Sequence, residues 1–340
     1  MYEGCEMWQV VGHQWAIALL QNSLTRGNIS HAYVFTGSPR IGKTTLALKL
    51  ARALNCTGED KPCGECLSCR KISQGIHPDV RMVDLAYQKG LLEEREGSTA
   101  LGIDAIRSIQ SDAALMPFEG RWKVFIIPQA ENMTPGAANC LLKTLEEPPP
   151  HVVLLLTALH TDLLFPTIVS RCQIFNLRPP STDLIGQALE RRWGLEGERA
   201  HLIAALSAGR MGWAVEAAQN EALLKERNER LDELLSLPGA RRLERLSFAQ
   251  RWGSQPERAK EILTLWLGWW RDLLLAKEGC WDKTENIDRR DILAEEAEKH
   301  ELGEIKEFIS SIRKALQQLE SNLNLRLALE VLMLDLPSKR

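Results

Sequence analysis

The most constraining feature of this chain is the stretch Gly37–Thr44, which has the sequence GSPRIGKT. It matches the phosphate-loop pattern GxxxxGK[ST] at every fixed position. The apolar run before it, Ala32–Thr36, is typical of a buried strand, and Thr45–Leu54 after it has the pattern of a helix. A chance glycine-rich turn seldom has both neighbours, so the sequence predicts a nucleotide-binding α/β unit.

The residue types in this loop suit phosphate chemistry. Gly37 and Gly42 let the backbone curl, so that successive N–H groups face an anion at the start of a helix. Lys43 is placed to reach the β- and γ-phosphates, and the Thr44 hydroxyl to hold Mg²⁺, with Thr45 beside them in the first helical turn. The expected ligand is therefore ATP or ADP with Mg²⁺.

Length and charge narrow the class of protein. The 340 residues suggest two or three domains, and the net charge of −3 gives no general attraction for nucleic acid. No run of about 18 apolar residues is present that could cross a membrane. Residues 1–6 lack the basic start and the apolar run of a secretory signal, so we expect a cytoplasmic protein with reduced cysteines.

Four of the eight cysteines lie close together after the expected helix of the phosphate-loop unit. They have the spacing Cx₆Cx₂Cx₂C and are Cys56, Cys63, Cys66 and Cys69. Four thiolates in a short loop are the tetrahedral set of a structural Zn²⁺ site, and they leave no ligand position open for catalysis. Free thiols or a redox pair are the alternatives. Direct DNA contact by this module is disfavoured, because residues 56–69 carry one lysine against three acids.

The rest of the N-terminal half alternates between strand and helix patterns. Strands are expected at residues 78–84, 122–127, 152–157 and 173–177, and helices at 14–26, 103–115 and 137–147. This alternation predicts an α/β core with a parallel sheet, which ends near Leu177. The polar stretch Gln88–Ala100 is expected to form an exposed loop.

The C-terminal half has no strand pattern after the boundary Pro179-Pro180-Ser181. Short helices are expected at residues 183–193, 198–208 and 212–219, and further helices at 221–236, 240–252, 256–277, 289–299, 302–319 and 324–336. Trp266, Trp269 and Trp270 lie on a strongly apolar helix, which favours a core or subunit interface over a base-stacking surface.

The end of the third strand departs from what an active ATPase needs. In a phosphate-loop ATPase one carboxylate there helps to hold the Mg²⁺ shell and a second polarises the attacking water. Here the strand ends in Pro128-Gln129-Ala130-Glu131, and neither Pro128 nor Gln129 can play these parts. Glu131 could replace them only if the loop bent back. We expect it instead at the start of the next helix, where the helix dipole favours an acid.

Together these residues resemble the bacterial DNA polymerase III clamp-loader subunits, which belong to the AAA+ class. The matching stretches span the chain and comprise HAYVFTG at 31–37, the four-cysteine module, NCLLKTLEEP at 139–148, SRC at 170–172 and NLNLRLALE at 322–330. The resemblance implies an α/β AAA+ phosphate-loop domain with a parallel sheet and an inserted zinc module, followed by an all-α lid domain and an all-α collar domain. The expected bounds are 1–178, with the zinc module at 56–69, then 179–220 and 221–340.

Two kinds of subunit in this family carry such an N-terminal half. The gamma/tau subunits are ATPase motors with an acidic pair, and the delta-prime subunits keep Ser-Arg-Cys but have lost hydrolytic parts. This chain departs from the motors at Pro128 and Gln129, and again at Gly212, where the motors have a phosphate-sensing arginine. The departures favour a delta-prime subunit, and the alternative is a gamma/tau-like ATPase that hydrolyses ATP itself.

The resemblance also implies partners and a role for one arginine. Delta-prime subunits join gamma/tau and delta subunits in a hetero-pentamer that loads the sliding clamp onto primed DNA. Arg171 would then act in trans on the ATP of a neighbouring subunit, where such a finger stabilises the charge of phosphoryl transfer. A structural salt bridge is the alternative role for Arg171. The chain's own site is expected to bind ATP or ADP with little or no hydrolysis.

Overall fold

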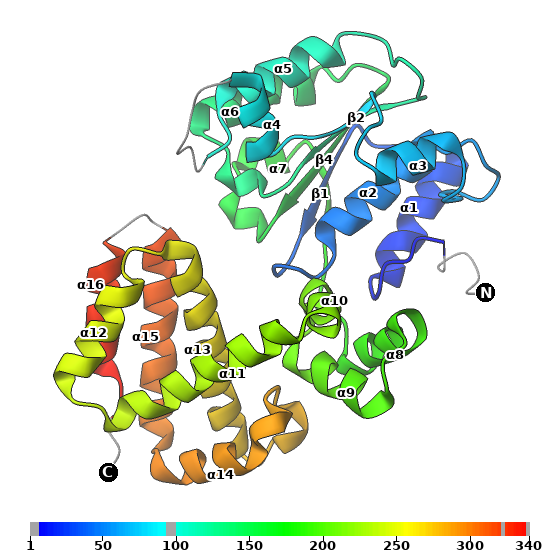
Figure 1. The fold of residues 1–340 in the computed structure, drawn as a ribbon. Helices are drawn as coiled ribbons and strands as arrows, with labels where there is room; N and C mark the ends of the chain where they lie inside the picture. The colour runs from blue at the N-terminus through cyan, green and yellow to red at the C-terminus, as the bar shows by residue number, and fades with distance from the viewer. Residues whose placement is uncertain (1–6, 93–99, 321–323, 338–340) are drawn as a thin grey trace. The chain divides into compact units, whose positions relative to one another are not determined.

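The computed structural model describes residues 7–92, 100–320 and 324–337, and the chain forms two compact units. The first comprises residues 1–184 and 209–212, and the second 185–208 and 213–340 (Figure 1). In the described part of the chain all strands belong to the first unit. The expected boundary between lid and collar at residue 220 stays a prediction.

A five-stranded parallel sheet forms the centre of the first unit, in the order β2-β3-β4-β1-β5. The strands are β1 (Ala32–Thr36), β2 (Val80–Met82), β3 (Lys123–Ile127), β4 (Val152–Ala158) and β5 (Gln173–Asn176). The register pairs Ala32 with Leu154, and Lys123 with Val152. This order confirms the predicted parallel sheet and puts β1, which carries the phosphate loop at its end, between β4 and β5.

Helices cover both faces of this sheet (Figure 1). They are α1 (Gln14–Arg26), α2 (Lys43–Asn55), α3 (Leu67–Ser73), α4 (Leu85–Leu92), α5 (Ile103–Ala113), α6 (Pro135–Glu146) and α7 (Pro166–Val169), with 3-10 turns at Ala130–Asn132 (η2) and Thr161–Leu163 (η3). Tyr33 and Phe35 pack with α1 and α2 on one face, whereas Ala32 and Val34 pack with α5 and α6 on the other. Because alternate residues meet apolar cover on both sides, β1, β3 and β4 are buried along their whole length.

The loop predicted at Gln88–Ala100 is partly wrong, because α4 runs through its first residues. The Asp84 carboxylate accepts a hydrogen bond from the Tyr87 amide at 2.9 Å, which is the contact of a helix N-cap. Gln88 is only 6% exposed, and its Oε1 accepts a hydrogen bond from the Gly102 amide. The local composition did not indicate that this polar residue is buried in a helix. The remaining part of the predicted loop, residues 93–99, lies outside the described residues.

The C-terminal half is helical in its described residues, as predicted. Its helices are α8 (Thr182–Trp193), α9 (Gly197–Leu206), α10 (Met211–Gln219), α11 (Glu221–Ser236), α12 (Arg242–Trp252), α13 (Pro256–Lys277), α14 (Arg290–Lys299), α15 (Leu302–Glu320) and α16 (Leu325–Asp335), with 3-10 turns at Leu237–Gly239, Trp281–Lys283 and Ile287–Arg289. No helix in the described residues combines the length and apolar character that a membrane crossing requires.

The tryptophans of α13 form the centre of the second unit's core. Trp266, Trp269 and Trp270 are at most 2% exposed. The Trp270 ring meets Phe308 edge-on with centroids 4.7 Å apart, and Trp266 stacks on Phe248 at 5.0 Å. Buried rings in such contacts are not available for stacking on bases. The preference for a core role is therefore confirmed.

Candidate functional site

The phosphate loop joins β1 to α2 as the sequence predicted, and its glycines are required by geometry. Gly37 has a positive φ of 141°, and a Cβ there would lie 2.5 Å from the Leu177 carbonyl oxygen. Gly42, at φ 108°, is the N-cap of α2, which begins at Lys43, two residues earlier than predicted. The first amides of a helix have no acceptor within it, so this end of α2 offers N–H groups to an anion.

The Lys43 side chain lies over the phosphate loop and hydrogen-bonds to the loop backbone. Its ammonium group donates hydrogen bonds to the carbonyl oxygens of Gly37 and Ser38, the second at 2.9 Å. Burial lowers the pKa of Lys43, and the nearby Glu131 carboxylate raises it. Thr44 is half-buried and Thr45 is exposed in the first turn of α2. The predicted ligand residues therefore lie together at one end of α2.

The turn after β3 puts Glu131 in the first turn of the 3-10 helix η2, at the start of the next helical element as expected. Gln129 has a left-handed backbone with φ 50°, and the 3-10 turn η2 follows it, so the loop bends back. The Glu131 carboxylate accepts a hydrogen bond from the Leu159 amide at 3.2 Å and acts through its charge on Lys43. The Gln129 side chain accepts instead from Asn132 at 3.3 Å. The carboxylate near the phosphate loop is thus supplied by Glu131, not by the strand end itself.

Gly212 contacts the phosphate loop through its backbone. Its amide donates a hydrogen bond to the Arg40 carbonyl oxygen at 2.8 Å, and a Cβ at this position would lie 3.2 Å from the same oxygen. A larger residue therefore requires a shift of the loop. The resemblance assigns a phosphate-sensing arginine to this position. Here Gly212 occupies it, and its backbone packs closely against Arg40.

Arg171 follows α7 and is 35% exposed. One terminal nitrogen pairs with the Glu146 carboxylate at 2.8 Å, and the other donates hydrogen bonds to the Thr167 carbonyl at 3.0 Å and the Ser170 hydroxyl at 3.2 Å. Glu146 is 52% exposed, so the pair contributes at most about 1 kcal/mol to stability. A salt bridge is the alternative role expected for Arg171, but its partner Glu146 could not be predicted because the two residues lie on separate elements.

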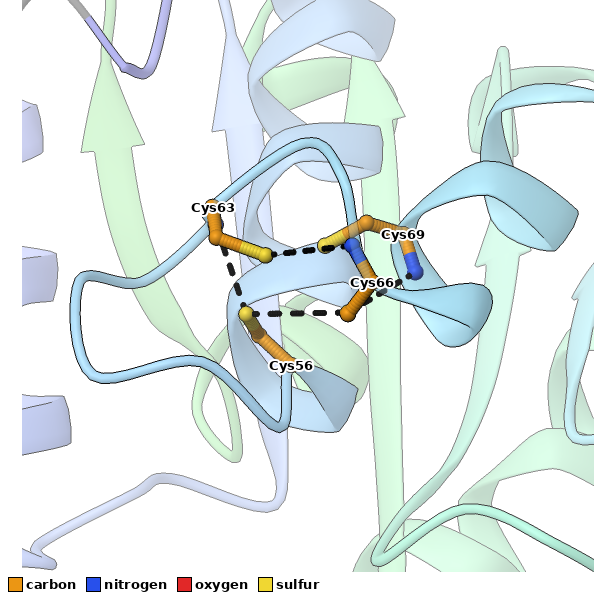
Figure 2. Close-up of side chains that lie close together, drawn as sticks. All are labelled: Cys56, Cys63, Cys66 and Cys69. Atoms are coloured by element: carbon orange, nitrogen blue, oxygen red, sulfur yellow. Dashed lines mark hydrogen bonds between the residues drawn. The ribbon is translucent and has the colours of Figure 1, made fainter.

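The four cysteines converge on one point between α2 and α3 (Figure 2). Their sulfur atoms all lie within 4.8 Å of one another, and those of Cys56 and Cys66 are 3.9 Å apart. Metal–sulfur bonds of about 2.3 Å in a tetrahedron need sulfur separations of about 3.8 Å. Backbone amides also point at the sulfurs, such as Cys63 N–H to Cys56 Sγ at 3.3 Å and Cys69 N–H to Cys66 Sγ at 3.4 Å. The cluster can therefore hold a metal ion after a small contraction.

The thiols differ in their ease of ionisation. Burial opposes the ionisation of Cys66, but hydrogen bonds from Thr57 and Cys69 outweigh it and lower the pKa of Cys66 to about 6. Burial raises the pKa of Cys69 to about 12. A divalent cation favours the thiolate at each ligand, since it cancels the repulsion among four negative sulfurs.

A network that the sequence did not predict joins the cysteine module to the sheet. His77 is 3% exposed, its Nδ1 accepts a hydrogen bond from the Asp79 amide at 3.1 Å, and its Nε2 therefore donates to the Ser68 hydroxyl at 2.9 Å. Burial lowers the pKa of His77, which keeps the ring neutral. Lys71 on α3 also pairs with Glu119 at 2.6 Å. The cysteine-containing segment is thereby fixed to the loop before β3.

Comparison with protein families matches both halves of the chain to subunits of DNA polymerase III. Residues 12–181, half of the sequence, match the family described as "DNA polymerase III, delta subunit", and residues 221–337 match "DNA polymerase III, delta subunit, C terminal". The chain belongs to the clamp-loader subunit family of DNA polymerase III.

Curated relatives are DNA polymerase III subunits as well. The tau subunit of Escherichia coli strain K12 is 38% identical over 183 residues, which is 53% of this chain and 27% of the relative. The tau subunit of Bacillus subtilis is 36% identical over 178 residues, 52% of this chain and 30% of the relative. The gamma subunit of Buchnera aphidicola is 33% identical over 53% of this chain and 47% of the relative. The similarity thus spans less than half the length of each of these relatives.

Comparison with solved structures finds two proteins with clamp-loader-related titles, at low TM-scores and low identity. A gamma subunit-related protein of DNA polymerase III from Thermotoga maritima has a TM-score of 0.48 and 18% identity, over 93% of this chain and 97% of that one. The clamp-loader delta protein of Bacillus subtilis has a TM-score of 0.35 and 14% identity, over 94% and 98%.

Proposed function

We propose that this chain is a delta-prime subunit of the DNA polymerase III clamp loader, which helps to load the sliding clamp onto primed DNA in the bacterial cytoplasm. The observation that carries the proposal is a division of roles in the first unit. Arg171, between Ser170 and Cys172, is 35% exposed, while Pro128 and Gln129 deprive the chain's own loop of the strand-end acidic pair. A subunit that lends an arginine but turns over little ATP fits this combination.

The proposed partners are gamma/tau and delta subunits in a hetero-pentamer. The sliding clamp and primer-template DNA are contacted through the assembled complex. Family membership supports a complex of this kind, and the test is reconstitution. The chain should co-purify with gamma/tau and delta subunits, and clamp loading should fail when it is left out. Normal loading in its absence contradicts the proposal.

Arg171 is proposed as the catalytic group that this chain offers to its neighbour. Its guanidinium would contact the γ-phosphate of ATP bound to an adjacent gamma/tau subunit and stabilise the charge of transfer. The half-exposed position and the short segment after α7 support access from outside. The Glu146 pair does not oppose this role, because an exposed ion pair is weak enough to exchange.

The chain's own loop is proposed to bind ATP or ADP with Mg²⁺ and to hydrolyse ATP slowly or not at all. Gly37, Gly42 and Lys43 form an intact cradle, with Thr44 and Thr45 in the first turn of α2. Calorimetric titration of the isolated chain with ADP tests binding, and steady-state turnover of ATP tests hydrolysis. Turnover of the order of ten per second, usual for enzymes, contradicts this part of the proposal.

A gamma/tau-like ATPase is the second candidate, and two observations favour it. The curated relatives named here are tau and gamma subunits, and Glu131 brings a carboxylate back to the phosphate loop. The two candidates differ in one measurement. A motor hydrolyses ATP by itself and loses that activity with Lys43→Ala, whereas a delta-prime subunit shows little turnover to lose.

The four cysteines are proposed to hold one structural Zn²⁺. Zinc prefers four thiolates in a tetrahedron, and all four positions are filled by the chain, so the ion would stiffen the fold without taking part in a reaction. Metal analysis should give one zinc per chain, and Cys69→Ser should lose it and unfold at a lower temperature. Cys280→Ser, which changes a cysteine of the second unit outside this cluster, is the control and should keep the zinc.

A further inference from the structure

Glu131 is joined to the phosphate loop through a single residue, Leu159. The Leu159 amide donates a hydrogen bond to Glu131 Oε1 at 3.2 Å, and the Leu159 carbonyl accepts one from the Gly37 amide at 3.0 Å. Gly37 in turn accepts a hydrogen bond from the Lys43 ammonium group. Three successive hydrogen bonds thus connect the carboxylate with the residue that would meet the phosphates.

The backbone fixes this position of Glu131. The Gln129 amide donates to the Thr157 hydroxyl at 3.2 Å, which holds the turn against the end of β4. The Asn132 amide then closes the 3-10 turn on the Gln129 carbonyl at 2.8 Å. Because Thr157 is only 2% exposed, this anchor lies inside the fold. The backbone of Glu131 is therefore held near the phosphate loop by the course of the chain.

One oxygen of this carboxylate has no partner. Oε1 is taken by Leu159, whereas Oε2 is buried and receives no hydrogen bond from the described residues. A buried carboxylate oxygen without a donor is costly, so it points to a cation or to water held by one. The Lys43 ammonium group acts on Glu131 through its charge, but its hydrogen bonds go to the loop carbonyls.

We propose that Glu131 is the acidic group that holds the Mg²⁺ shell of a nucleotide in this chain's own site, in place of the carboxylates that Pro128 and Gln129 cannot provide. The inference rests on the proposed binding of ATP or ADP. It assigns to Glu131 a share in binding the divalent cation, alongside the Thr44 hydroxyl and the phosphates. It does not require hydrolysis, because holding the metal shell and activating a water are separate tasks.

If Glu131 holds the cation shell, removing its charge should change ADP affinity in opposite directions with and without Mg²⁺. Without Mg²⁺, the carboxylate repels the phosphates, so removing its charge should tighten binding of free ADP. With Mg²⁺, the carboxylate attracts the cation, so removing its charge should weaken binding of Mg·ADP. A nearby charge typically changes such an equilibrium by about tenfold or more. A residue that only caps the end of β4 would show neither change.

Calorimetric titration with ADP, in Mg²⁺ and in EDTA, tests this on the wild-type chain, Glu131→Gln and the control Glu147→Gln. Gln can still accept the Leu159 hydrogen bond, and Glu147 is an exposed acid at the end of α6. The ratio of the two affinities should fall about tenfold in Glu131→Gln and stay unchanged in Glu147→Gln. An unchanged ratio in Glu131→Gln overturns the inference and leaves nucleotide binding intact.

Two further outcomes separate this inference from the proposed function. If the wild-type chain binds ADP under neither condition, the nucleotide part of the proposed function is wrong and the inference falls with it. If Glu131→Gln fails to fold, the wild-type chain with Mn²⁺ and ADP decides, since Mn²⁺ broadens the nuclear resonances of nearby amides. Strong broadening at Glu131 and Leu159, but not at Glu147, supports the inference, and equal intensities at all three overturn it.

Discussion

Lys43 and Arg171, the two cations of the first unit that are proposed to contact phosphate, are held by the chain in different ways. Lys43 lies inside the phosphate loop and donates hydrogen bonds to the neutral carbonyls of Gly37 and Ser38. Arg171 lies 35% exposed after α7 and pairs with the Glu146 carboxylate at 2.8 Å. A phosphate that binds Lys43 replaces its hydrogen bonds to neutral carbonyls. A phosphate that binds Arg171 must compete with the full negative charge of the Glu146 carboxylate.

The difference indicates how each cation is suited to its proposed task. An anion that reaches Lys43 displaces hydrogen bonds to neutral carbonyls, while the Glu131 carboxylate acts on Lys43 through its charge. At Arg171 only an anion stronger than a single carboxylate can displace Glu146, and a terminal phosphate with two negative charges meets that condition. The Lys43 site therefore favours a nucleotide that stays bound. The Arg171 site favours a contact made only when a neighbouring subunit with bound ATP is in place.

The largest expected effect comes from Arg171→Ala. If the arginine serves a neighbouring subunit, the DNA-stimulated ATPase of the assembled loader should fall by about 10³-fold at the affected site, the lower end for arginine fingers. Binding of ADP by this chain alone should not change. Arg107→Ala is the control, because Arg107 is 63% exposed on α5 and its ion pair in the described part of the chain is with Asp104 on the same helix. An ATPase equal to wild type rules out the finger, provided that size-exclusion chromatography shows the complex intact.

The reverse pattern is expected for Lys43→Ala. Loss of charged hydrogen bonds worth roughly 1.5–3 kcal/mol should weaken ADP binding by the isolated chain about 10- to 100-fold. The ATPase of the neighbouring subunit should stay within about twofold, since Lys43 and Arg171 act on different nucleotides. Lys89→Ala, at an exposed position on α4, is the matched control in the same titration. Equal losses of ATPase from Lys43→Ala and Arg171→Ala would show that the two cations serve one nucleotide.

The two cations should also differ in their response to pH. Burial lowers the pKa of Lys43 from the ordinary value of about 10.4, with the Glu131 charge opposing this. Phosphate binds the protonated amine, so ADP affinity should fall as pH rises through the lowered pKa, before an ordinary lysine titrates. Glu131→Gln removes the opposing charge and should move this fall to lower pH. Arginine does not titrate in this range, so the Arg171-dependent ATPase should show no such step. The affinity of the wild-type chain and of Glu131→Gln for ADP, measured from pH 7 to pH 10, tests this prediction.

Much of both units could be predicted because local patterns settle the bounds of many elements. The bounds of α1, β1, α11 and α13 agree with the sequence, since apolar periodicity and end residues such as Gly27 and Pro256 act within a few residues. The cysteine cluster also follows from spacing alone, because a short loop leaves four thiols few ways to lie apart.

The parts that could not be predicted depend on contacts between distant segments. Glu131 returns to the loop because a non-glycine residue, Gln129, adopts a left-handed backbone and bonds to β4. Residue types give little indication of such a turn, since left-handed conformations are uncommon outside glycine. The pair of Arg171 with Glu146 likewise depends on how α6 meets α7, which no local pattern records.

The smallest expected effect belongs to Glu146→Gln, which asks whether the pair restrains Arg171. Because Glu146 is 52% exposed, losing the ion pair should change the stability of the chain by less than about 1 kcal/mol. The ATPase of the assembled loader without DNA should rise about two- to fivefold. The reason is that the Glu146 carboxylate, which competes with phosphate for the guanidinium by less than about 1 kcal/mol, is removed. Glu147→Gln, one residue along and with no ion pair in the described chain, removes the same charge and should leave the rate unchanged. A fall in the rate with Glu146→Gln would mean that the carboxylate aligns Arg171 for the phosphate, and the contrast with Lys43 would then concern positioning, not competition.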